Sequence, residues 1–166
     1  MTASFNATFD NPEISPPPNQ TISRPRILVV EDEQDLRQLT AEVLIDAGYQ
    51  VEVAENGDTA WSALQLSKPD LLIADQFMPK ASGVKLLRKI HAARMTLPVI
   101  MTTGFLPVWG LALHTWLQPV KMLHKPFSFQ KLLATVKNVL DTTDSGSDGF
   151  KRPSLPPEPP LPRLFS

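Results

Sequence analysis

The sequence predicts an α/β fold in which a five-stranded parallel sheet carries helices on both faces. Two observations lead to this prediction. Strand-like and helix-like patterns alternate five times between residues 25 and 141, as in parallel sheets whose strands are joined by helical crossovers. Three of the strand-like segments are continuous apolar runs, which indicates strands buried on both faces.

The first half of the domain begins with a buried strand at 26–30. A helix follows and ends at Gly48; the apolar residues at helical spacing are Leu36, Leu39, Val43, Leu44 and Ala47. Residues 50–54 alternate between apolar and polar side chains, which indicates a half-exposed edge strand. Asn56-Gly57 then turns the chain into a second helix, and a buried strand at 71–74 ends at Asp75.

The second half repeats the pattern. Ser82-Gly83 opens a helix, and residues 97–101 form the third buried strand. Residues 107–117 are predicted to be helical, although they carry Trp109 and Trp116, and a short last strand covers 120–123. Ser128 is expected to cap a final helix whose apolar residues lie on one face.

Composition places this domain between two tails. The chain has 166 residues, of which 42% are hydrophobic and 20% charged, as in an ordinary soluble domain. Most of the seventeen prolines lie in the first 25 residues or beyond residue 152. Such segments bury too little apolar surface to offset the entropy of ordering them. We therefore expect a flexible tail at 1–24, a domain at 25–141 and a Pro-rich flexible tail at 142–166.

Charge and cysteine content exclude several kinds of chemistry and favour some partners over others. Cysteine is absent, which excludes disulfides and thiolate chemistry. No secretory signal or membrane-length apolar run is present, so a cytoplasmic location without membrane contact is expected. No acidic residue occurs between Gln76 and Leu140, where nine basic residues lie. Because these are not interleaved with aromatic residues, a solvated face explains them, and as a partner an acidic protein is favoured over DNA.

Polar residues gather at the ends of the predicted strands. Glu31 and Asp32 follow the first strand, and Asp75 ends the third. Thr103 and Lys125 follow the fourth and fifth. Each alone has a structural explanation, as a cap, a turn or a solvated surface residue. Ligands of open parallel sheets bind at the carboxyl ends of the strands, so this joint placement predicts a site on that edge.

The residue types suggest phosphoryl chemistry. Three neighbouring carboxylates repel one another, and Mg²⁺ relieves the repulsion while keeping places for water and a phosphate oxygen. A carboxylate can also attack phosphorus and form an aspartyl phosphate. Lys125 would neutralise phosphoryl oxygens, and Thr103 would donate a hydrogen bond to one of them.

Four motifs, in this order and spacing, resemble the response-regulator receiver family: ILVVEDE (27–33), LLIADQFMP (71–79), PVIMTTG (98–104) and HKPF (124–127). The resemblance covers essentially all of 25–141. It implies a doubly wound (βα)5 receiver fold with strand order 2-1-3-4-5, and Asp75 as phosphoacceptor. It also gives Thr103 the switch-hydroxyl position and Lys125 the family's lysine position, with a cis peptide before Pro126.

The metal ligands are likewise implied by the resemblance. Asp32 would bind Mg²⁺ directly and Glu31 through a water molecule. Asp75 itself and the backbone carbonyl of Phe77 would complete the protein ligands.

The resemblance implies a single-domain response regulator of a two-component phosphorelay. A sensor histidine kinase or a phosphotransfer protein would donate the phosphoryl group. The chain would not be an enzyme in the ordinary sense, since it would catalyse only its own phosphorylation and dephosphorylation. A phosphatase of related topology would require a second Asp two residues after Asp75. Phe77 stands at that position, so the sequence argues against this class of enzyme.

Three departures from the family pattern keep an alternative open. Met122 stands where the family usually has an aromatic switch residue, Gln76 and bulky Phe77 follow Asp75, and the fourth helix region, 105–118, is atypical. Met122 and the atypical fourth helix favour a receiver-like adaptor that binds a protein partner independently of phosphorylation, whereas the complete set of acids with Thr103 and Lys125 opposes it. Gln76 and Phe77 are instead expected to crowd access to Asp75 by water or by a phosphatase.

Overall fold

The computed structural model describes residues 24–79, 82–104 and 120–144. Its elements, in chain order, are β1 (Arg26–Val30), α1 (Gln34–Asp46), β2 (Gln50–Ala54), α2 (Gly57–Ser67), β3 (Leu71–Asp75), α3 (Gly83–Ala92), β4 (Val99–Thr103), β5 (Val120–His124) and α5 (Phe129–Asp144). The strands form one parallel sheet in the order β2-β1-β3-β4-β5. The predicted fold class and strand order are therefore confirmed.

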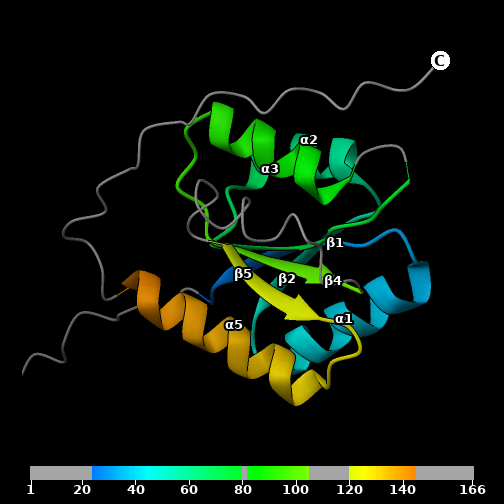
Figure 1. Cartoon of the computed structure of the whole chain (residues 1–166). Helices are drawn as coiled ribbons and strands as arrows, with labels where there is room; N and C mark the ends of the chain where they lie inside the picture. The colour runs from blue at the N-terminus through cyan, green and yellow to red at the C-terminus, as the bar shows by residue number, and fades with distance from the viewer. Residues whose placement is uncertain (1–23, 80–81, 105–119, 145–166) are drawn as a thin grey trace, which may run out of the picture.

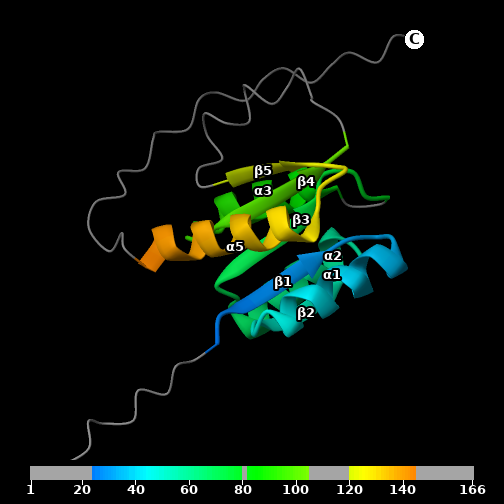
Figure 2. The same ribbon diagram turned by 90° about the horizontal axis from the view of Figure 1, so that it is seen from below.

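Helices cover both faces of the sheet. In Figure 1, α2 and α3 lie on one side of the strands while α1 and α5 lie on the other, and Figure 2 shows the same layers from below. Each face has its own apolar core. One core joins Leu28, Leu72 and Met101 to residues of α2 and α3. The other joins Ile27, Ile73 and Ile100 to Leu44 of α1 and Leu132 of α5.

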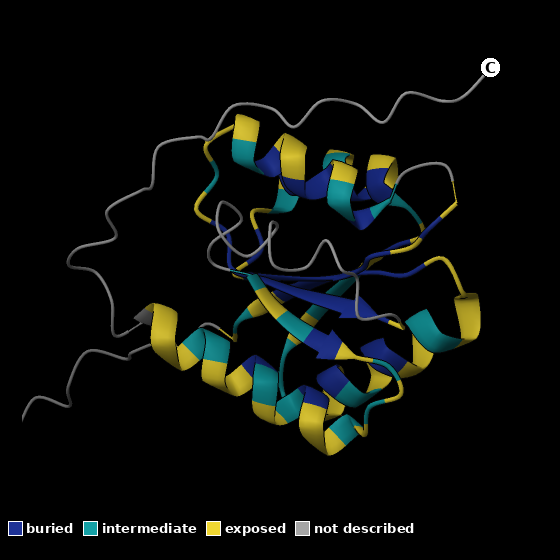
Figure 3. Cartoon of the chain, viewed as in Figure 1, coloured by how far each residue is buried: buried dark blue, intermediate teal, exposed yellow. Residues whose placement is uncertain are grey.

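Burial along the strands follows their place in the sheet. All residues of β3 and β4 are buried, whereas the outermost strand β2 leaves Val53 49% exposed. Figure 3 shows this pattern as dark strands between helices whose outer faces are exposed. The continuous apolar runs thus became central strands and the alternating segment an edge strand, as predicted.

Local signals set several helix boundaries. The Asn56 side chain accepts hydrogen bonds from the backbone N–H groups of Asp58 and Thr59, which caps α2. Ser128 accepts from the backbone N–H of Lys131 at 3.2 Å, as predicted for the last helix. Gly48, with φ of +95°, follows the end of α1, and this left-handed conformation suits a residue without a side chain.

Two boundaries differ from expectation. The strand predicted at 97–101 begins at Val99, because Pro98 has no N–H group to donate to the sheet. Helix α5 continues to Asp144, beyond residue 141. The helix predicted at 107–117 and nearly all of both predicted tails lie outside the described residues. None of the described helices has the length and apolar character needed to cross a membrane.

The start of α3 is packed closely against the end of β3. A Cβ atom added to Gly83 would lie 2.2 Å from the backbone carbonyl oxygen of Asp75, far inside van der Waals contact. Gly83 therefore allows the first turn of α3, which Ser82 caps by accepting from the backbone N–H of Lys85, to touch the backbone of the strand that ends at Asp75.

We expect Gly83→Ala to destabilise the protein by about 3 kcal/mol, the upper range for overpacking, because the obstructing atom belongs to the backbone. Urea denaturation would measure the change. Gly104→Ala is the matched control, since no atom of the described residues lies within 4 Å of an added Cβ there. Equal effects of the two substitutions would contradict the role assigned to the Gly83 contact.

Candidate functional site

The carboxyl edge of the sheet brings four predicted site residues together. Glu31 and Asp32 follow β1, Asp75 is the last residue of β3, and Lys125 follows β5 directly. The sheet hydrogen bonding extends beyond these strand ends: the Glu31 N–H donates to the Ala54 carbonyl, and the Lys125 N–H donates to that of Thr103. The positions of these side chains are thus fixed by the sheet.

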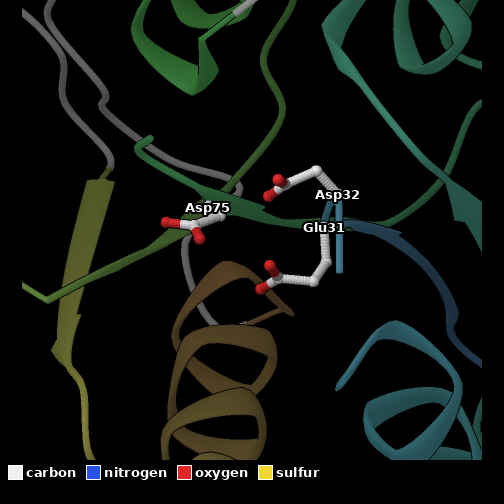
Figure 4. A group of neighbouring side chains, drawn as sticks. All are labelled: Glu31, Asp32 and Asp75. Carbon is white, nitrogen blue, oxygen red and sulfur yellow. The ribbon is translucent and has the colours of Figure 1, made fainter. Parts of the chain in front are cut away.

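The three acids form one cluster. Glu31, Asp32 and Asp75 each have a carboxylate oxygen within 4.8 Å of the others, and Figure 4 shows the Glu31 and Asp32 side chains extending toward Asp75. Glu31 and Asp75 are buried, at 6% and 8% exposure, while Asp32 is exposed. This set fits Mg²⁺, because all donors are hard oxygen atoms and the exposed side of the cluster leaves room for water ligands.

Lys125 neutralises part of this acidic cluster. Its Nζ atom lies 2.7 Å from Oδ2 of Asp75 and 2.9 Å from Oε2 of Glu31. Charge-assisted hydrogen bonds of this length are strong. Lys125 therefore acts as a counterion for both buried carboxylates.

Burial and charge shift two pKa values in this group. Burial raises the pKa of Glu31, and nearby Asp75 raises it further, while the hydrogen bond from Lys125 opposes both effects. Burial tends to lower the pKa of Lys125, but its hydrogen bonds to Asp75 and Glu31 and their charges outweigh that tendency, so its pKa is raised. Lys125 is thus held in its charged form.

Asp75 is further oriented by the turn that follows it. Its Oδ1 atom accepts a hydrogen bond from the backbone N–H of Phe77 at 3.2 Å, so the two carboxylate oxygens have different partners. The Phe77 side chain is 56% exposed. The peptide bond between Lys125 and Pro126 is cis, as the family resemblance implied.

Thr103 lies at the end of β4 and is completely buried. The register pairs Asp75 with Thr102, so Thr103 stands one position further along the edge. The use of the Thr103 hydroxyl for a phosphoryl oxygen stays a prediction. The same holds for the backbone carbonyl of Phe77 as a metal ligand.

Sequence reasoning missed the contribution of Arg37. This residue of α1 donates from Nη1 to the backbone carbonyl oxygens of Glu31, at 2.7 Å, and Asp32, at 3.2 Å. It thereby holds the loop that carries two of the three acids. No sequence motif predicts this contact, because Arg37 binds backbone carbonyl oxygens whose positions depend on the fold of the loop.

Comparisons with known proteins support the same assignment. Residues 27–137 match the sequence family described as response regulator receiver domain. The chain is 32% identical over 115 residues to the response regulator receiver protein CpdR of Brucella abortus, covering 69% of this chain and 96% of that protein. It is 34% identical over 126 residues to the phosphate regulon transcriptional regulatory protein PhoB of Pseudomonas aeruginosa, covering 72% and 53%.

Solved structures agree in fold. The response regulator receiver domain protein of Methanospirillum hungatei, described as CheY-like, superposes with a TM-score of 0.69 at 27% identity, covering 74% of this chain and 98% of that one. This chain spans about half the length of several of the curated relatives that it matches, and almost the whole of CpdR.

Proposed function

The chain belongs to the response regulator receiver domain family, and from this premise we propose that Asp75 accepts a phosphoryl group in a two-component phosphorelay. The observation that carries the proposal is the pairing of Asp75 with Lys125 at 2.7 Å inside a cluster of three acids. A nucleophilic carboxylate and a fixed cation for phosphoryl oxygens are the groups that such a transfer needs.

The proposed transfer proceeds by displacement at phosphorus. A carboxylate oxygen of Asp75 forms a bond to phosphorus while the bond between phosphorus and an imidazole nitrogen of the donor breaks. That nitrogen keeps the electron pair. Lys125 neutralises the phosphoryl oxygens, and the Phe77 N–H fixes the orientation of the Asp75 carboxylate through Oδ1. Hydrolysis of the aspartyl phosphate by water returns Asp75 to its starting state, so the chain catalyses only its own modification.

Glu31, Asp32 and Asp75 would hold Mg²⁺, with the Phe77 carbonyl as a further ligand. When bound, the ion supplies positive charge opposite the negative charge of the transferred group. Its binding also relieves the repulsion among the three carboxylates.

Mg²⁺ should stabilise the folded protein because it binds the assembled cluster and not the unfolded chain. The expected gain is about 2.7 kcal/mol at one hundred times the Kd, visible as a higher melting temperature. Asp32→Ala should remove this response while leaving the metal-free protein at least as stable, because one repelling charge is gone.

Asp35→Ala is the matched control for that measurement, since Asp35 is an exposed acid in the first turn of α1. It should keep the Mg²⁺ response. A melting temperature that is the same with and without millimolar Mg²⁺ would argue against a metal site in this cluster.

The donor in this proposal is a sensor histidine kinase or a phosphotransfer protein, because these are the proteins with which receivers exchange phosphoryl groups. The match to CpdR, which is covered to 96% of its length and is called a response regulator receiver protein, supports the proposal of a response regulator. Three exposed basic residues on α3, Lys85, Arg88 and Lys89, support an acidic protein as a further partner, and a cytoplasmic location suits all of these partners.

A second candidate function is an adaptor that binds its partner independently of phosphorylation. Met122 favours it, because this partly buried residue packs in the core beside α2 and α3. A thioether chain adapts to gaps without two discrete positions, so it transmits a switch poorly.

One experiment separates the two functions. The purified protein is incubated with Mg²⁺ and a small phosphodonor, and its intact mass is measured. The gain of one phosphoryl group, removed again by base, supports the receiver function. A mass that does not change while the fold is intact would favour the adaptor.

A further inference from the structure

The loop between β1 and α1 has three consecutive backbone carbonyl groups that share one donor residue, Arg37. The carbonyl oxygens of Glu31 and Asp32 accept hydrogen bonds from Nη1 of Arg37 at 2.7 Å and 3.2 Å. The carbonyl oxygen of Glu33 accepts from the backbone N–H of Arg37 at 2.9 Å. This last bond belongs to the first helical turn, whereas the other two come from a partly buried side chain and tie the loop to the helix that follows it.

The other restraints on this loop lie at its two ends. The sheet pairing ends at Glu31, whose N–H donates to the Ala54 carbonyl at 3.2 Å. The N-cap residue of α1, Glu33, makes no side-chain capping hydrogen bond with the described residues, although such a bond commonly fixes the start of a helix. Asp32 lies between these two ends. Within the described part of the chain, Arg37 therefore supplies the side-chain contact that fixes its backbone.

The orientation of these peptide groups also reaches a carboxylate of the cluster. In a trans peptide, the carbonyl and the N–H point in opposite directions. The Asp32 carbonyl is directed to Arg37, so the N–H of the same peptide group, which belongs to Glu33, is directed away from Arg37. Burial raises the pKa of Glu31, and a hydrogen bond from the Glu33 N–H is among the effects that oppose this rise. One peptide group thus serves both Arg37 and the Glu31 carboxylate.

Arg37 has two effects on a cation in the acidic cluster, and they have opposite signs. Its guanidinium group is always charged and repels a nearby cation, which weakens binding, although solvent reduces this repulsion at an exposed edge. Its hydrogen bonds hold the loop that carries Glu31 and Asp32 beside Asp75 (Figure 4). This effect strengthens binding, because a site that is already assembled loses less conformational freedom when the ion binds.

We propose that Arg37 is a positioning residue for the Mg²⁺ site, which holds Glu31 and Asp32 in the arrangement that binds the ion. The inference rests on the proposed function, since it concerns the ion that the acidic cluster would hold. Arg37 acts through the two loop carbonyls and does not contact the ion. Outer-shell groups that orient metal ligands act in the same way.

The test compares the Kd of Mg²⁺ for the wild type, Arg37→Met and Arg37→Lys, measured by isothermal titration calorimetry on the full chain. Arg37→Met keeps most of the aliphatic side chain and removes both hydrogen bonds to the loop. It should raise the Kd about tenfold, the lower end of what the loss of an outer-shell partner costs. Arg37→Lys should stay within about threefold of the wild type, because an ammonium has three N–H donors and a single nitrogen makes both bonds in the wild type.

Arg88→Met is the matched control, because Arg88 is an exposed arginine of α3 outside the acidic cluster. Its Kd should equal that of the wild type. Urea denaturation of each variant shows that the Kd is measured on folded protein. Arg37→Gln also lacks the guanidinium group and should give the same loss of affinity if Arg37→Met does not fold.

Three results would overturn the inference and leave the proposed function standing. An unchanged Kd with a lower stability would show that Arg37 supports only the fold. A lower Kd would show that charge repulsion outweighs positioning. Binding by Arg37→Lys as weak as that by Arg37→Met would show that donation to the loop carbonyls is not the cause. A folded wild type that binds no Mg²⁺ would overturn the inference together with the proposed metal site.

Discussion

The Asp75→Asn variant is expected to take up no phosphoryl group from Mg²⁺ and a small phosphodonor, while the wild type gains one. The substitution keeps the shape of the side chain and replaces the anionic nucleophile by a neutral amide, which cannot form the acyl phosphate. Intact-mass measurement after equal incubation checks the result. Of the substitutions considered for this chain, this one should have the largest effect on activity.

Asp58→Asn is the matched control. Asp58 is an exposed residue of α2 that pairs with Lys89 at 3.0 Å, outside the acidic cluster, so its loss should leave phosphorylation unchanged. If Asp75→Asn still takes up a full phosphoryl group, another residue is the acceptor and the assignment of Asp75 is wrong.

Lys125→Met should give a large loss of stability. Removing the ammonium leaves two buried carboxylates, Glu31 and Asp75, facing each other without their counterion. Breaking a buried ion pair in this way costs about 3–5 kcal/mol. Because the Lys125 side chain keeps 24% exposure, we expect about 2–3 kcal/mol for the metal-free protein, measured by urea denaturation at neutral pH.

The loss should depend on pH. Burial raises the pKa of Glu31 above its ordinary value of 4.5. Ionisation of Glu31 therefore lowers the free energy of unfolding when the pH rises above that pKa. The deficit of Lys125→Met should therefore shrink as the pH falls toward 4.5. Since the pKa of Lys125 is also raised, above 10.5, its stabilising contribution in the wild type should persist at neutral pH and fade only above pH 10.5.

Lys121→Met provides the comparison for this measurement, because Lys121 is an exposed lysine of the neighbouring strand β5. Its replacement should change stability by less than about 0.5 kcal/mol. Similar losses for both lysines would show that the pairing of Lys125 with Glu31 and Asp75 has little effect on stability.

The sheet could be predicted because strands that are buried on both faces are continuous apolar runs in the sequence. The apolar runs of β1, β3 and β4 required two covered faces, and their central positions confirm this. The acidic cluster could be predicted for a related reason: residues that follow parallel strands share one edge. Glu31, Asp32 and Asp75 therefore meet although Asp75 lies far from the other two in the sequence.

Other features depend on contacts that no local pattern encodes. The sequence identified Gly83 as the start of a helix. It did not show that this position excludes a side chain, because the obstructing Asp75 carbonyl belongs to another element. In the sequence, Arg37 resembles any other helical residue, because its hydrogen bond to the Glu31 carbonyl depends on how the preceding loop folds. Gln76 follows Asp75 in the motif, yet only the structure shows that its side chain is buried and that its Oε1 atom has no hydrogen-bond partner among the described residues.

The pairing of Lys125 with Asp75 and Glu31 also affects the nucleophilicity of the Asp75 carboxylate. An oxygen of Asp75 that accepts the Lys125 ammonium at 2.7 Å has one lone pair engaged and its charge largely compensated. Such an oxygen is a poorer nucleophile than a solvated carboxylate. The proposed transfer therefore includes a step in which Lys125 moves one hydrogen bond from the Asp75 carboxylate to a phosphoryl oxygen of the donor.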